Sequence, residues 1–334
     1  MQSTNKKTRQ DEQGNDSLLH KQNEVAGDLP PLVVILGPTA VGKTGFAIQL
    51  ARKMNGEIVS ADSRLLYRGM DIGTAKPSLE QRKQVPHHLI DVADPDQIWS
   101  LTLFKQKAQE IIHDIQARNR LPFLVGGTGQ YIRAIVEDWQ IPEVKPDFRL
   151  RKALENWADE IGSDGLHVRL SVLDPDSANR IDSRNLRRTI RALEVIFHSG
   201  KKFSNQQLKG NPIYRLVQIG LILPRQELFN HIDLRIDQMF ADGFVSEVQS
   251  LLLKGYASDL ASFSAIGYRE VIDFLQGKTT LDEALILIRR RTRLLVRRQA
   301  NWFKQDDPDI YWFNAKDIPM LEIESLLRCK LQLD

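Results

Sequence analysis

The first half of the chain alternates short apolar runs with segments of helical periodicity. Three runs have the length and β-branched content of buried strands: Leu32–Leu36, Glu57–Ala61 and Pro122–Gly127. Between the last two, Phe104–Arg118 places apolar side chains at helical spacing. Strands that alternate with helices are typical of a parallel sheet, in which ligands bind at the carboxyl ends of the strands. The pattern therefore predicts an α/β core with its site at that edge.

The pattern changes after residue 142. Residues 143–211 are charge-rich and helical in pattern, without a run that could extend the sheet, and we interpret them as an inserted all-helical domain. A strand-like run returns at Arg215–Leu223, and long amphipathic helices follow, one set through Leu253 and another from Leu281 to Phe303. We therefore expect the core to comprise residues 31–142 and 212–334.

The composition indicates more about the cellular environment of the protein than about its function. Residues 1–30 are polar and lack the apolar segment of a secretory signal, so we expect a disordered tail. We expect no membrane association through a spanning helix, because no window approaches about 20 apolar residues. The single cysteine, Cys329, excludes an internal disulfide and a multi-cysteine zinc site, and suits the cytoplasm. A net charge of +3 means that any nucleic-acid site must depend on local clustering of charge.

The segment after the first predicted strand matches the GxxxxGK[ST] phosphate-binding pattern. Its backbone amides would surround phosphate oxygens, its lysine would neutralise charge, and its threonine hydroxyl could bind Mg²⁺. The placement between a strand and a helix favours a polyphosphate site over a simple turn. The motif alone leaves open which polyphosphate is bound, including the nucleotide of a kinase or NTPase. The predicted loop consists of Gly37, Pro38, Thr39, Ala40, Val41, Gly42, Lys43 and Thr44.

The second predicted strand delivers Asp62 at its carboxyl end, beside this loop. From position alone, Asp62 could act as a general base, ligate Mg²⁺ or cap a helix.

The residues that follow carry a resemblance to a known family. Residues 60–77 read SADSRLLYRGMDIGTAKP, which strongly resembles the signature of tRNA dimethylallyltransferases. Other segments match the family in the same order along the chain: Pro86–Asp91, Val125–Tyr131, Arg191–Val195, Ile266–Arg269 and Arg297–Trp302. The resemblance covers about residues 32–302. Several separated motifs in one order are far more specific than a phosphate loop alone.

The resemblance implies a P-loop NTPase-like core, with a parallel sheet flanked by helices, that carries an inserted helical tRNA-binding domain. It also implies that a dimethylallyl group is transferred from dimethylallyl pyrophosphate to N6 of adenosine 37, beside the anticodon. The expected acceptors are tRNAs reading codons that start with U, the products are N6-dimethylallyladenosine and pyrophosphate, and the cofactor is Mg²⁺. The expected partner is the tRNA anticodon stem-loop, and we expect a cytoplasmic, bacterial-type monomer.

Residue roles follow from the same resemblance. Asp62 would be the general base, Lys43 and Thr39 would assist catalysis, the phosphate loop would hold pyrophosphate, and Thr44 would bind Mg²⁺. For Thr128 a turn residue that caps the next helix is the alternative, and the arginines could instead pair with carboxylates or contact pyrophosphate. The expected tRNA-contacting residues are Asp62, Ser63, Arg64, Leu65, Thr128, Arg149, Arg187, Arg188, Arg191, Arg269, Arg297 and Arg298.

Three other functions remain open at this point. An adenylate isopentenyltransferase shares the loop and the aspartate, but the helical insertion and the arginine-rich late helix favour a tRNA substrate. A kinase or NTPase would consume ATP, whereas the expected enzyme needs none. A non-catalytic RNA-binding protein would not need an intact loop with Asp62. The adjacent His87 and His88 would point to opposite faces of a strand, which favours a structural role for both.

Overall fold

The computed structural model describes residues 29–142, 144, 146–206 and 209–333. The expected tail, residues 1–30, therefore lies almost wholly outside the described residues. The described chain forms two compact units: one runs to Val136 and resumes at Pro212, and the other comprises Glu137–Asn211. In the described part of the chain, no helix is both long and apolar enough to cross a lipid bilayer.

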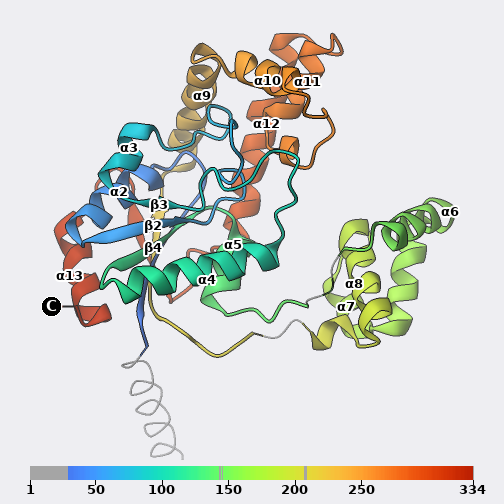
Figure 1. Ribbon diagram of the computed structural model, residues 1–334, viewed down its shortest axis with the longest axis horizontal. Helices are drawn as coiled ribbons and strands as arrows, with labels where there is room; N and C mark the ends of the chain where they lie inside the picture. The colour runs from blue at the N-terminus through green and yellow to red at the C-terminus, as the bar shows by residue number, and fades with distance from the viewer. Residues whose placement is uncertain (1–28, 143, 145, 207–208, 334) are drawn as a thin grey trace, which may run out of the picture. The chain divides into compact units, whose positions relative to one another are not determined.

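The larger unit is built on a six-stranded sheet of order β3-β2-β4-β1-β5-β6, in which every pairing is parallel. Figure 1 labels β3, β2 and β4 of this sheet. This arrangement confirms the predicted α/β class and the four predicted strands. Two strands were not among these four: the edge strand β6, which was not predicted, and the two-residue β3, which consists of His87 and His88. The strands are β1 (Pro31–Leu36), β2 (Gly56–Ser60), β3 (His87–His88), β4 (Leu121–Gly126), β5 (Arg215–Ile222) and β6 (Ile310–Asn314).

Helices cover both faces of this sheet, which explains why its central strand is apolar without interruption. Leu32 and Val34 of β1 pack with residues of α4, α5, α10 and α11. Val33 and Ile35 point to the other face, where they join residues of α2, α9 and α13. The helices of this unit are α2 (Lys43–Lys53), α3 (Leu79–Gln84), α4 (Leu101–Ala117), α5 (Gly129–Val136), α9 (Arg225–Ala241), α10 (Phe244–Leu253), α11 (Tyr268–Leu275), α12 (Leu281–Ala300) and α13 (Met320–Leu331), with a 3-10 turn at Ser262–Ser264.

The smaller unit contains helices, joined by loops, and no named strand among its described residues. It consists of α6 (Phe148–Leu173), α7 (Pro175–Arg180), α8 (Leu186–Ser199) and a 3-10 turn at Phe203–Asn205. Gly162 interrupts α6 with φ 79° and ψ 161°, a conformation that favours glycine. Leucines and isoleucines of α6 and α8 form this unit's own apolar core.

A buried carboxylate lies near the start of β2, at the end of that strand opposite Asp62. Glu57 is only 2% exposed and accepts two hydrogen bonds from Arg118, at 2.5 and 2.9 Å. Arg120 lies 3.2 Å away, and the His88 ring lies within hydrogen-bonding distance at 2.7 Å. The Arg118 hydrogen bonds lower the pKa of Glu57 to about 2. The contact of His88 with Glu57 agrees with the structural role expected for this histidine.

Candidate active site

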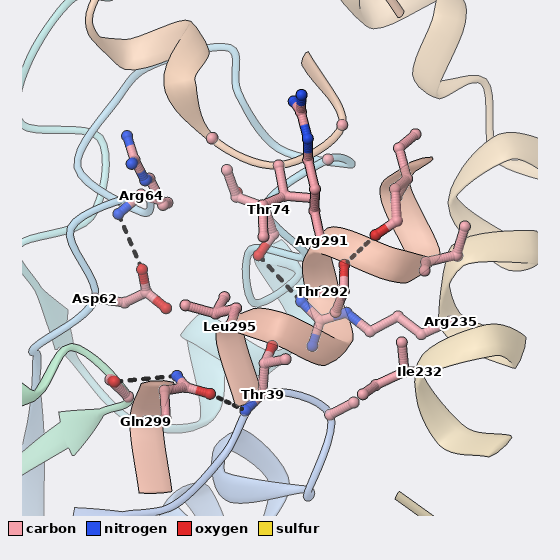
Figure 2. Close-up of a pocket in the computed structure, with 18 of the residues that line it drawn as sticks. Thr39, Asp62, Arg64, Thr74, Ile232, Arg235, Arg291, Thr292, Leu295 and Gln299 are labelled. Atoms are coloured by element: carbon pink, nitrogen blue, oxygen red, sulfur yellow. Dashed lines mark hydrogen bonds between the residues drawn. The ribbon is translucent and has the colours of Figure 1, made fainter. Parts of the chain in front are cut away.

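A pocket of about 630 Å³ opens at the carboxyl ends of β1, β2 and β4, where the sequence predicts the site (Figure 2). The phosphate loop, the turns after β2 and β4, and helices α9, α11 and α12 form its walls. Most of the expected site residues outside the helical unit therefore meet in one place. Those that line the pocket are Thr39, Ala40, Lys43, Asp62, Ser63, Arg64, Thr128, Arg269 and Arg298.

The phosphate loop follows β1 and needs its glycines for backbone geometry. Gly37 has φ +148°, and a Cβ there would lie 2.6 Å from the Leu221 carbonyl oxygen of β5. Gly42 is in the left-handed region with φ 99° and starts α2, whose first turn contains no acidic residue. The helix N-terminus is therefore available to attract an anion without competition from a carboxylate in its own first turn.

Lys43 lies half-buried at the start of α2. Its Nζ donates to the Gly37 and Pro38 carbonyl oxygens at 3.0 and 2.6 Å. Burial lowers the pKa of Lys43 to about 8, while the nearby Asp62 carboxylate opposes this shift. The lysine is therefore still mostly charged at neutral pH and becomes neutral as the pH rises above 8.

Asp62 follows β2 and is held by its own turn. Its Oδ1 accepts from the Arg64 backbone N–H at 2.9 Å, and within the described residues Oδ2 has no hydrogen bond. The next backbone N–H, that of Ser63, donates to the Thr128 hydroxyl at 3.3 Å, which ties the β2 turn to the β4 turn. A carboxylate that is oriented through one oxygen and free at the other is suited to accept a proton.

Gln299 joins two walls of this pocket, a role that sequence reasoning missed. Its side chain, 9% exposed, comes from α12, accepts from Thr39 N–H at 3.0 Å and donates to the Gly127 carbonyl oxygen at 3.0 Å (Figure 2). Both backbone groups lie beside the expected phosphate site. The residue was part of the quoted Arg297–Trp302 motif, but nothing in its spacing indicated these partners.

Arg235 is the second residue that sequence reasoning missed. Figure 2 shows it reaching from α9 toward Thr74, whose carbonyl oxygen accepts from its Nη2 at 3.3 Å. Burial lowers the pKa of Arg235, and the Asp62 carboxylate opposes that shift, as it does for Lys43. Asp62 therefore interacts with both cations. Ile232, Ile236 and Met239 line the pocket from the same helix. The sequence signal that could have identified Arg235 was a cation among apolar residues at helical spacing.

The arginines of α12 fall into two groups. Arg289 pairs with Asp237, Arg293 with Asp233 at 2.6 Å, and Arg291 with Glu270 at 2.5 Å, so these three link α12 to α9 and α11. By contrast, no ion pair involves Arg290, Arg297 or Arg298 within the described ranges. Arg290 and Arg297 line a separate groove along α12. The run of arginines thus serves helix packing and leaves charges for an anionic partner.

The expected contacts in the helical unit divide in the same way. Arg149, Arg187 and Arg188 are exposed, without an ion pair to any described residue. Arg191 instead donates to the fully buried Glu194 at 2.5 Å and to the Val144 carbonyl oxygen at 2.9 Å. Its guanidinium is therefore engaged in holding α8 within this unit.

A family model described as IPP transferase matches residues 65–306, which is most of the chain. The chain belongs to the IPP transferase family. This membership identifies it as a prenyltransferase and confirms the expectation from the sequence motifs.

Members of the family resemble the chain over most of their length. A tRNA dimethylallyltransferase of Roseiflexus sp. (strain RS-1) is 50% identical over 275 residues, which cover 82% of this chain and 90% of that protein. The crystal structure of a tRNA isopentenylpyrophosphate transferase from Bacillus halodurans aligns with a TM-score of 0.68 and 40% identity, covering 90% of this chain and 97% of that one. A eukaryotic dimethylallyltransferase acting on tRNA aligns with a TM-score of 0.75 and 28% identity, covering 90% of this chain and 77% of that one.

Proposed function

We propose that this prenyltransferase moves the dimethylallyl group of dimethylallyl pyrophosphate onto N6 of adenosine 37 in tRNAs reading codons that start with U. The observation that carries the proposal is the composition of one pocket, in which Lys43, Arg235 and the phosphate loop lie near Asp62. Apolar side chains of α9 and α12, such as Ile236 and Leu295, complete the walls. A ligand with an anionic end and a short hydrocarbon end matches this lining. The names of the family relatives state that they act on tRNA.

Asp62 takes the role of general base in this proposal. The exocyclic amine of adenine is a poor nucleophile, and its nitrogen must lose a proton as it bonds to C1 of the prenyl group. The Arg64 backbone N–H orients one oxygen of Asp62 and leaves the other available to receive that proton. Thr39 would assist catalysis from the phosphate loop, where its backbone N–H is held by the Gln299 side chain.

The departing pyrophosphate gathers negative charge, which the protein can stabilise from two sides. Lys43 lies at the phosphate loop and Arg235 reaches in from α9, and the Asp62 carboxylate is close enough to both cations to oppose the lowering of their pKa values. Fixed cations and loop amides directed at a charge that grows during the reaction lower its barrier. No covalent intermediate with the enzyme is required, because the amine displaces pyrophosphate directly.

Thr44 would hold Mg²⁺ beside the pyrophosphate. In the described ranges, no three His, Cys, Asp or Glu side chains gather as a metal site. Mg²⁺ commonly takes one or two protein oxygens and completes its octahedron with phosphates and water, so a lone hydroxyl at a phosphate loop fits this ion. When bound, the ion would supply positive charge to the pyrophosphate oxygens.

The acceptor would reach the pocket from an anticodon stem-loop. A target base must leave its stack to enter a pocket, and a loop base leaves more easily than a paired one. The exposed arginines without carboxylate partners, including Arg149, Arg187, Arg188, Arg297 and Arg298, would contact RNA phosphates. Arg191 would support Arg187 and Arg188 from within the helical unit. Ser63, Arg64, Leu65, Thr128 and Arg269 would lie near the flipped base, and the enzyme would act as a cytoplasmic monomer.

The test is transfer of labelled dimethylallyl pyrophosphate, with Mg²⁺, to an anticodon stem-loop or to free AMP. Label in the RNA, reduced by 10²- to 10⁴-fold in Asp62→Asn, is the expected result. Asp94→Asn, which alters an exposed pair with Arg68, serves as the matched control and should keep full activity. Label in AMP alone would indicate an adenylate isopentenyltransferase, and ATP consumption without prenyl transfer would indicate a kinase or NTPase.

A further inference from the structure

One carboxylate outside the pocket is surrounded by hydrogen-bond donors. Glu247 of α10 accepts from three consecutive backbone N–H groups, those of Asp71 at 2.8 Å, Ile72 at 2.6 Å and Gly73 at 3.2 Å. The Tyr268 hydroxyl of α11 donates to the same carboxylate at 2.7 Å. Successive amides that converge on an anion form a binding nest, and here the anion is supplied by the chain itself.

The segment that Glu247 holds forms part of the pocket wall. Gly73 and Thr74 line the pocket directly. Gly73 packs so closely on Phe244 that a Cβ would lie 2.2 Å from that ring, so no larger side chain fits without a shift. Charge-assisted hydrogen bonds are roughly twice as strong as neutral ones, and three of them on adjacent residues fix the backbone of the segment.

The same segment reaches the candidate anion site through one contact. The Thr74 carbonyl oxygen accepts from Arg235 Nη2 at 3.3 Å, and the Thr74 hydroxyl donates back to the Met70 carbonyl oxygen at 2.6 Å. Arg235 otherwise has no hydrogen bond or ion pair within the described residues. The position of its guanidinium therefore depends on where the Thr74 carbonyl oxygen is placed.

We infer that Glu247 is a positioning residue for the pyrophosphate of the prenyl donor. It fixes residues 71–73, this segment places the Thr74 carbonyl oxygen, and that oxygen orients Arg235 toward the leaving group. The inference rests on the proposed function. It assigns a role in donor binding to a side chain that does not line the pocket.

The experiment is a double-mutant cycle with Glu247→Gln and Arg235→Gln, followed through KM for dimethylallyl pyrophosphate. Glutamine keeps the size of Glu247 but replaces one acceptor oxygen with a donor that the amides cannot pair with. Each single variant should raise the donor KM about tenfold, which corresponds to about 1.4 kcal/mol, because each removes or loosens a hydrogen bond that involves a charged group. The double variant should be no worse than Arg235→Gln alone, because coupled residues are not additive. KM for the RNA should change less than twofold.

Tyr268→Phe is the matched control, because it removes one donor from the same carboxylate and leaves the three amides paired. Its donor KM should stay within twofold of the parent. Additive effects in the cycle, an unchanged donor KM in either single variant, or an equal rise of both KM values would overturn the inference. If Glu247→Gln is unfolded at the assay temperature, Glu247→Asp is carried through the same cycle under the same criteria. A parent enzyme without any prenyl transfer would instead refute the proposed function.

Discussion

Replacing Gln299 with methionine should weaken the phosphate loop and the β4 turn together. The amide of Gln299 pairs with Thr39 N–H and with the Gly127 carbonyl oxygen, both at 3.0 Å. Methionine keeps a similar length but pairs with neither group. Each lost bond costs about 1 kcal/mol, so the change should destabilise the fold by about 2 kcal/mol. For a unit of this size the midpoint of thermal unfolding should fall by roughly 5 °C.

The two bonds can be separated with a second variant. Gln299→Glu keeps an acceptor for Thr39 N–H but places a negative charge against the Gly127 carbonyl oxygen and beside the phosphate loop. We expect it to raise KM for dimethylallyl pyrophosphate more than Gln299→Met does. Calorimetry and initial rates measure the two effects. An unchanged unfolding midpoint together with an unchanged donor KM in Gln299→Met would refute the bridging role of this residue.

Three further predictions use other contacts. Burial lowers the pKa of Lys43 to about 8, so kcat/KM for the donor should fall above that pH as the charge is lost, and Lys43→Arg should remove this decline in a pH-rate profile. The folded-state pKa of Glu57, about 2 against an ordinary 4.5, gives stability that is present above pH 4.5 and is lost as the pH falls toward 2; Glu57→Gln should flatten that dependence in acid unfolding curves. Arg297→Ala should weaken RNA binding and its salt dependence in filter-binding titrations without a change in unfolding temperature. Arg293→Ala should lower that temperature, because Asp233 loses its ion pair at 2.6 Å and keeps only the longer one with Arg289 at 3.9 Å.

The sequence was most informative where local chemistry decides the structure. Strands buried on both faces require continuous apolar runs, so β1 could be predicted from Leu32–Leu36 alone. The edge strand β6 was missed because only Ile310 of its five residues is buried, which leaves no two-sided apolar pattern. The phosphate loop and Asp62 also follow from local order, since both directly succeed strands of one parallel sheet.

Contacts made between distant helices could not be predicted in this way. Arg235 and Gln299 reach the pocket only because α9 and α12 pack over the carboxyl edge of the sheet. The carboxylates that form ion pairs with Arg291 and Arg293 belong to other helices. A run of arginines in the sequence does not indicate which of its members are paired. Helical spacing narrows the choice of face but does not identify the partner.

The strand order also constrains how the protein can fold. The central strand β1 needs neighbours from far along the chain, because Val33 pairs with Phe123 on one side and with Val217 on the other. Pairings between distant residues form slowly, since a long loop must close before any contact compensates for the lost entropy. During synthesis, β1 therefore gains its second neighbouring strand, β5, only after the whole helical unit has been made. The phosphate loop that follows β1 is supported on both sides only from that point. A chain that stops before Arg215 should lack a defined phosphate loop, even though it contains every residue of that motif.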